Sequence, residues 1–245
     1  MKRLKISKQQ GFTLVEIAIV LVIIGLLLGG ILKGQELINS AKVRSLADQN
    51  SSVQAAYYGF IDRYRAVPGD MDKDEACKVI GANTLVGCSG VTGTAGGNGN
   101  GRLDKGNWQE ASAVWAHLSA ANFIVGEYPG TATNASSYDA TQAPLNAFQQ
   151  PILLGSTSSY LDAGGSTVPE RLGLILGRST PVNILSQLDI KIDNGKPMSG
   201  VLRATKQTGG DYGAISDRST GCVDTTNKIW DVAKETQDCN SIYLY

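Results

Sequence analysis

The feature that most constrains this chain is an apolar run near its amino terminus, which extends from Phe12 to Leu32. Glu16 is the only charged residue in the run. An α-helix rises about 1.5 Å per residue, so the run would span roughly 30 Å, the thickness of the hydrocarbon core of a bilayer. The run therefore predicts a transmembrane helix at residues 12–32.

The residues before the run predict the orientation of this helix. They include cations and no acidic residue: Lys2, Arg3, Lys5 and Lys8. Positive residues favour the cytoplasmic side of a membrane, so we expect the rest of the chain to cross to the other side. An ordinary secretory signal has a shorter apolar region with a small-residue cleavage site after it. No such site follows Leu32.

The junction between the basic segment and the apolar run carries a motif. It reads Gln9, Gln10, Gly11 and then Phe12, with Glu16 four residues further on. The string GFTLVEIAIVLVIIGLLL resembles the class III signal of type IV pilins and of the pseudopilins of type II secretion. This resemblance, which covers only the amino-terminal part of the chain, implies cleavage between Gly11 and Phe12 by a prepilin peptidase. It further implies N-methylation of the new terminal residue, Phe12.

The same resemblance implies a location and partners. The precursor would be a single-pass protein of the inner membrane with its carboxyl-terminal head in the periplasm. The processed chain would then assemble with copies of itself or with other pilins into a pilus or pseudopilus filament, which can extend to the cell surface. Many major pilins carry a proline just past the middle of the membrane segment, and this chain has none there. A pseudopilin or a minor pilin therefore stays open.

Glu16 is a candidate assembly residue. A lone carboxylate inside hydrocarbon costs at least a few kcal/mol, so its presence marks a functional group unless the charge is paired. Cleavage would create an amine on Phe12. The resemblance implies that Glu16 pairs with the Phe12 amine of a neighbouring subunit and sets the register of stacked helices. The alternative is that Glu16 turns to the amine of its own chain or extends to the cytoplasmic surface.

The helix is predicted to continue beyond the membrane, because helix formers follow Leu32 and the next proline is Pro68. Its later part carries an apolar stripe at helical spacing: Val53, Ala56, Tyr57, Phe60, Ile61 and Tyr64. We expect this stripe to pack on a globular head. The chain then has three parts, a leader at 1–11, a long helix at 12–66 and a head at 67–245.

Glycines interrupt the apolar part of this helix. Gly25 with Gly29, and Gly30 with Gly34, form two G-x-x-x-G motifs. In a bilayer, small residues allow helices to approach closely. Such short motifs are common, so the alternative that these glycines have no specific packing role stays open.

The four cysteines predict disulfides within the head. They are Cys77, Cys88, Cys222 and Cys239, and they include no C-x-x-C pair. Zinc ligands normally occur in tight pairs, so a zinc site is disfavoured. Two local disulfides are expected in an exported domain, and free thiols are the alternative.

The head is predicted to be mixed helix and sheet. Trp108, Ala111, Trp115 and Leu118 indicate an amphipathic helix at 107–122, and Thr180 with Pro181 would open a short helix that runs to Leu188. Short apolar runs between turn residues indicate antiparallel strands at 151–154, 172–176, 200–205 and 241–245. The fold class is therefore α+β, a long amino-terminal α-helix packed on an antiparallel β-sheet head.

The segment 70–106 is predicted to be loop-like, with the tract GTAGGNGNG at its centre. Oxygen-bearing side chains in and after this tract suit calcium: Asn98, Asn100, Asp104 and Glu110. The register of an EF-hand fails, because counting from Asn98 places Arg102 fifth and Gln109 twelfth. A flexible surface loop is favoured, a calcium site of another kind stays open, and we predict no metal and no cofactor.

The charge balance and the single histidine exclude some functions. The chain has 22 basic and 22 acidic residues, so it has no basic field that would favour nucleic acid. With His117 as its one histidine and no nucleophile motif, we predict no catalytic residue and no enzymatic activity. The expected function is a structural subunit of a filament. The alternatives are a minor pilin or adhesin-like binding subunit, or a type II secretion pseudopilin.

Overall fold

The computed structural model of the chain describes residues 13–81, 88, 96–165 and 168–245. The predicted leader at 1–11 and the cleavage residues Gly11 and Phe12 lie outside the described residues. The chain forms two compact units, residues 1–41 and 42–245, and the boundary between them falls within the first helix. Each unit is considered by itself.

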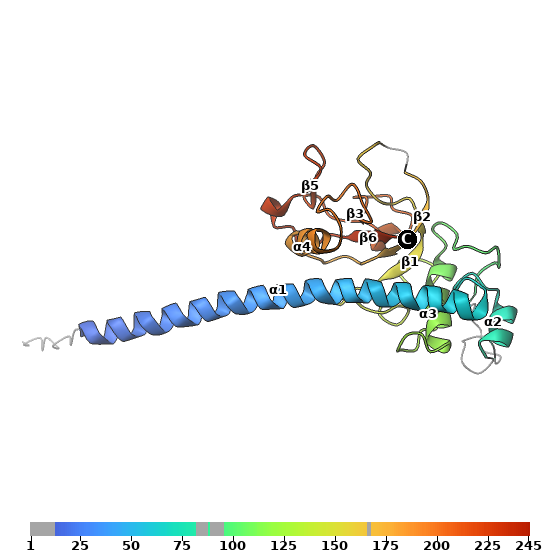
Figure 1. Cartoon of the computed structure of the whole chain (residues 1–245), viewed down its shortest axis with the longest axis horizontal. Helices are drawn as coiled ribbons and strands as arrows, with labels where there is room; N and C mark the ends of the chain where they lie inside the picture. Colours follow the sequence, from blue (N-terminus) through green and yellow to red (C-terminus); the bar gives the residue numbers. More distant parts are fainter. Residues whose placement is uncertain (1–12, 82–87, 89–95, 166–167) are drawn as a thin grey trace, which may run out of the picture. The chain divides into compact units, whose positions relative to one another are not determined.

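The long amino-terminal helix is confirmed. Helix α1 begins at Leu14 and ends at Tyr64 (Figure 1). Beyond it, Arg65 adopts a left-handed backbone conformation with a φ of 55°. This left-handed residue ends the helix, and Pro68 further along would not allow it to continue, because proline lacks a backbone N–H.

The apolar stripe of α1 belongs to the core of the second unit. Its buried residues are Val43, Leu46, Val53, Ala56, Tyr57 and Phe60. Two polar contacts fix the same part of the helix: Gln49 donates from Nε2 to the carbonyl of Leu145 at 2.9 Å, and the hydroxyl of Tyr245 donates to Oδ1 of Asn50 at 2.8 Å. The predicted packing of this stripe on the head is therefore confirmed, and it begins earlier in the helix than the predicted stripe.

The predicted antiparallel sheet is also confirmed. Its strands are β1 (Leu153–Thr157), β2 (Arg171–Ile175), β3 (Leu202–Ala204) and β6 (Ser241–Leu244). All neighbours are antiparallel, in the order β1-β2-β6-β3, so the last strand of the chain lies between two earlier ones (Figure 1). Leu174 pairs with both Leu154 and Tyr243, which places buried side chains in register across the sheet.

In its described parts the head also contains helices α2 (Lys73–Val79), α3 (Trp108–Ala120) and α4 (Val182–Ile192), and a small hairpin of β4 (Val223–Asp224) and β5 (Ile229–Trp230). Two short 3₁₀ turns occupy Gly213–Ile215 and Val232–Lys234. Asn107 caps α3, because its Oδ1 accepts from the N–H of Gln109 at 3.1 Å and of Glu110 at 3.3 Å. Inside the core, Trp115 of α3 donates from Nε1 to the hydroxyl of Tyr138 at 2.7 Å.

One part of the loop prediction was wrong, because α2 lies within the segment 70–106. Asp72 starts this helix, since its Oδ1 accepts from the N–H of Asp74 at 2.8 Å and of Glu75 at 3.0 Å. Both predicted disulfides are confirmed. Cys77 bonds to Cys88, with 5.5 Å between their Cα atoms, and the pair Cys222–Cys239 has a separation of 5.7 Å.

The packing of α1 predicts a difference in stability between two neighbouring aromatic residues. Phe60 is fully buried, whereas the side chain of Tyr58 is 49% exposed. We expect Phe60→Ala to lower the free energy of unfolding by about 3 to 5 kcal/mol, because it leaves a cavity in the core. Tyr58→Ala is the matched control and should cost less than about 1 kcal/mol. Denaturant titration of the full chain in detergent micelles measures both values, and equal losses would contradict the assigned packing.

Candidate assembly site on the amino-terminal helix

In the apolar part of α1, residues 14–32, the side chains are exposed on every face of the helix. Within the described residues, α1 is the one helix long and apolar enough to cross a membrane, and none of its most apolar stretch is buried by the chain itself. Its exposed apolar residues include Leu14, Ile19, Leu26 and Leu32. A surface of this kind is stable only when lipid or another apolar protein surface covers it.

Glu16 lies in the first turn of α1 and forms a capping box with Thr13. Its Oε2 accepts from the backbone N–H of Thr13 at 2.8 Å and from the Thr13 hydroxyl at 2.8 Å. In return, the N–H of Glu16 donates to Oγ1 of Thr13 at 3.3 Å. These contacts satisfy donors that the helix start would otherwise leave free, and they hold the carboxylate at the positive end of the helix dipole.

The capping box was missed in the sequence, although the pattern Thr-x-x-Glu at 13–16 is its ordinary signal. It means that the carboxylate of Glu16 has hydrogen-bond donors in its own chain. Those donors are neutral, so the negative charge of Glu16 still lacks a cationic partner among them. Pairing with the Phe12 amine stays a prediction, because Phe12 lies outside the described residues.

The helix glycines have no packing role inside the chain. A Cβ atom added at Gly25, Gly29, Gly30 or Gly34 would meet no atom within 4 Å. In the head, by contrast, a Cβ at Gly173 would lie 2.6 Å from Cδ1 of Ile242. Each helix glycine costs up to about 1 kcal/mol relative to alanine, and no contact among the described residues offsets this cost. Successive helix residues rotate by about 100°, so the two motifs lie on different faces.

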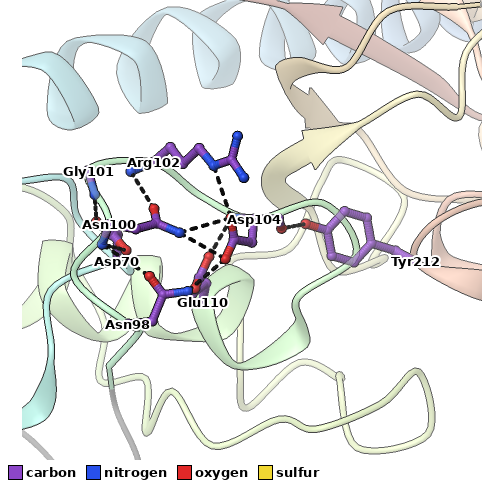
Figure 2. A network of polar contacts seen from close by, with 8 residues as sticks. All are labelled: Asp70, Asn98, Asn100, Gly101, Arg102, Asp104, Glu110 and Tyr212. Carbon is purple, nitrogen blue, oxygen red and sulfur yellow. Dashed lines mark hydrogen bonds and ion pairs between the residues drawn. The ribbon is translucent and has the colours of Figure 1, made fainter.

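The other residues considered from the sequence lie in the head. His117 is fully buried, and its Nδ1 accepts from the backbone N–H of Gly69 at 2.9 Å, which makes it a structural residue. The four cysteines form the two disulfides described above. Within the described ranges, no group of three or more His, Cys, Asp or Glu side chains stands ready to hold a metal ion. The polar residues of the glycine-rich loop do come together, and Figure 2 shows them.

Comparison with known proteins bears on the amino terminus alone. A family model described as the prokaryotic N-terminal methylation motif matches residues 6–32. No curated protein and no solved structure matches the chain. The methylation motif, followed by a long apolar helix, is consistent with a type IV pilin-like protein or pseudopilin. In general, this motif implies processing by a prepilin peptidase, anchoring of the precursor in the membrane and assembly with other pilins.

The glycines of α1 predict an effect that is confined to association. We expect Gly29→Leu to leave insertion and folding unchanged, because a side chain there meets nothing in its own chain. Self-association of the helix should fall roughly tenfold, since the added side chain holds a second helix away. Val20→Leu adds apolar volume on the opposite face and serves as the control. A membrane two-hybrid assay of helix association measures both variants, and equal association of Gly29→Leu and wild type would contradict a contact at Gly25 and Gly29.

Proposed function

We propose that this protein is a structural subunit of a type IV pilus or a related pseudopilus filament, assembled through its amino-terminal helix after cleavage between Gly11 and Phe12. The observation that carries the proposal is a methylation motif matched at residues 6–32, together with a helix from Leu14 whose most apolar stretch is not buried by its own chain. The proposed role is structural and not enzymatic.

Packing between helices supplies the stabilising contacts in this proposal. In the membrane, lipid already covers the apolar side chains, so the hydrophobic effect does not drive helices together. Close packing does so instead, and the exposed glycines at 25, 29, 30 and 34 permit it. The filament core would then be formed by residues 12–32 of successive subunits, with the heads outside.

Electrostatics would set the position of each subunit along the filament. In the uncleaved chain, Thr13 donates two hydrogen bonds to Glu16 but carries no charge. Cleavage adds a cationic amine at Phe12, directly before Thr13. An isolated carboxylate in hydrocarbon is unfavourable, and pairing Glu16 with the amine of a neighbouring subunit would remove this unfavourable free energy. The pair forms only at one stagger of the two helices, so it would define the axial step.

A second candidate is a minor pilin, an adhesin-like binding subunit or a type II secretion pseudopilin. The continuity of α1 favours this group, because the helix runs unbroken from Leu14 to Tyr64 without the proline that many major pilins carry. The amount of the protein in purified filaments separates the two roles. A core subunit would be the main component, whereas a minor subunit would be present in a few copies per filament.

The proposal predicts the same assembly defect for two different substitutions of Glu16. Glu16→Val removes the charge and the acceptor, whereas Glu16→Gln removes the charge but keeps an acceptor for Thr13. We expect both to reduce sheared filaments by about tenfold or more while membrane insertion stays normal, because the charge and not the cap is needed. Glu36 lies beyond the apolar run in an exposed position, where its carboxylate pairs with Lys33. Glu36→Gln is therefore the control and should assemble normally. Normal assembly of Glu16→Gln would show that capping alone is the role of Glu16.

Processing predicts a defined mature amino terminus. Mass spectrometry of the filament subunit should find N-methylated Phe12 as the first residue. We expect Gly11→Ala to slow cleavage and Gly11→Leu to block it, because the small residue at the cleavage site is replaced by a larger one. A leader that is still attached in wild-type filaments would reject cleavage at this position.

A further inference from the structure

A cluster of polar side chains lies in the head (Figure 2). Its members come from three parts of the chain: Asp70 follows the end of α1, Asn98, Asn100 and Asp104 lie in the glycine-rich loop, and Glu110 lies in the first turn of α3. The loop packs closely on the turn at Asp70. Gly97 donates to the carbonyl of Met71 at 2.9 Å, and Gly99 donates to the carbonyl of Asp70 at 2.8 Å. A Cβ at Gly97 would lie 2.7 Å from the Cα of Asp70, so the glycine is needed for this approach.

Two of the carboxylates in the cluster are held by donors from the loop. Asp70 is 3% exposed, and its two oxygens accept from the backbone N–H of Asn100 at 3.1 Å and of Gly101 at 2.6 Å. Asp104 accepts from the side-chain amide of Asn98 at 2.7 Å and from that of Asn100 at 3.0 Å. The loop therefore supplies hydrogen-bond donors to both carboxylates.

Glu110 is the unusual member, because it is fully buried and only partly satisfied. Its Oε2 accepts from the N–H of Asp104 at 2.5 Å, but its Oε1 has no hydrogen-bond partner. A buried carboxylate oxygen without a partner is costly, so a positive partner would stabilise it.

The protein supplies little positive charge to these three carboxylates. Arg102 pairs with Asp104, with 3.1 Å between Nε and Oδ1, but its side chain is 71% exposed and in contact with solvent. Lys105 is directed to Asp211 instead, at 3.3 Å. The cluster thus combines three acidic groups, one solvated cation and one buried oxygen without a donor.

We propose that the cluster is a calcium-binding site, with Glu110 and Asp104 as carboxylate ligands and Asn98, Asn100 and Asp70 as further oxygen donors. The side chains of the cluster are carboxylates and amides, whose oxygen atoms suit hard cations, whereas zinc prefers histidine and cysteine. Calcium accepts six to eight oxygens in an irregular arrangement, which fits donors drawn from a turn, a loop and a helix. Magnesium demands a near-ideal octahedron and is a poorer match.

Binding would require a small rearrangement, because no set of three acidic side chains among the described residues is already at metal-binding spacing. Asn98 and Asn100 now present their amide nitrogens to Asp104. The amide oxygen is at the other side of the same planar group, so rotation of the side chain exchanges a donor for an oxygen ligand. In this account the two side-chain amides occupy the carboxylate of Asp104 in the absence of the ion. Calcium takes the place of their N–H groups when it binds. The inference does not depend on the filament role.

Calcium titration of the full chain in detergent micelles tests the proposal. After treatment with EDTA, isothermal titration calorimetry with calcium chloride should show one site per chain. At a hundredfold excess over Kd, the Tm should rise by about 5 to 10 °C, because the ion binds the folded state. Magnesium chloride should give a much smaller shift. The absence of calcium-dependent heat and of a Tm shift at about 10 mM calcium would overturn the proposal, since this exceeds the Kd range of extracellular calcium modules. An equal shift with magnesium would overturn the choice of ion.

Variants locate the ion. Glu110→Gln removes the buried charge, so it should raise the Tm in EDTA and weaken calcium binding by at least about tenfold, a combination that a purely structural residue would not give. Asp104→Asn should weaken calcium binding to a similar extent. Asp139→Asn changes an exposed head carboxylate, which accepts from the N–H of Thr141 at 2.8 Å, and should leave the Kd unchanged. A wild-type Kd in both Glu110→Gln and Asp104→Asn would place the ion elsewhere.

Discussion

Everything else in this structure depends on an apolar helical surface that the chain does not cover itself. From Leu14 to Leu32, the large side chains of α1 are exposed on every face, and Glu16 is the one charge among them. Such a surface cannot remain in water, so it must be covered by lipid or by other helices. The same helix continues to Tyr64, and there its apolar stripe belongs to the core of the head. One element therefore connects an anchoring surface to a folded domain.

Much of the fold could be predicted from the sequence, because apolar residues follow helical spacing in the later part of α1 and in α3. The four strands of the main sheet were predicted from short apolar runs between turn residues. The position of β6 between β2 and β3 could not be predicted, since strand order depends on pairing between distant segments. The hairpin of β4 and β5 has only two residues in each strand, too few to show an alternating pattern. Helix α2 was missed because glycine-rich and polar sequence follows it, although Asp72 and Glu75 carry its capping signal.

The candidate sites were predictable to different degrees. Glu16 was identified from the cost of a charge in hydrocarbon, yet its capping contact with Thr13 was found only in the structure. The residues of the glycine-rich loop were noted as possible calcium ligands, but Asp70 was not. Its place in that cluster depends on tertiary contacts with Asn100 and Gly101, residues 30 and 31 positions later in the chain. The complete burial of Glu110 likewise follows from packing and not from local sequence.

The central claim is that copies of the helix cover one another and that Glu16 and the terminal amine neutralise each other between subunits. A density map of filaments purified from cells, at a resolution that shows side chains, tests this most directly. The account predicts helices at 12–32 packed side by side in the core, with the carboxylate of Glu16 within about 4 Å of the Phe12 nitrogen of a neighbouring subunit. A core in which Glu16 contacts only Thr13 of its own chain, or filaments that lack this protein, would contradict it.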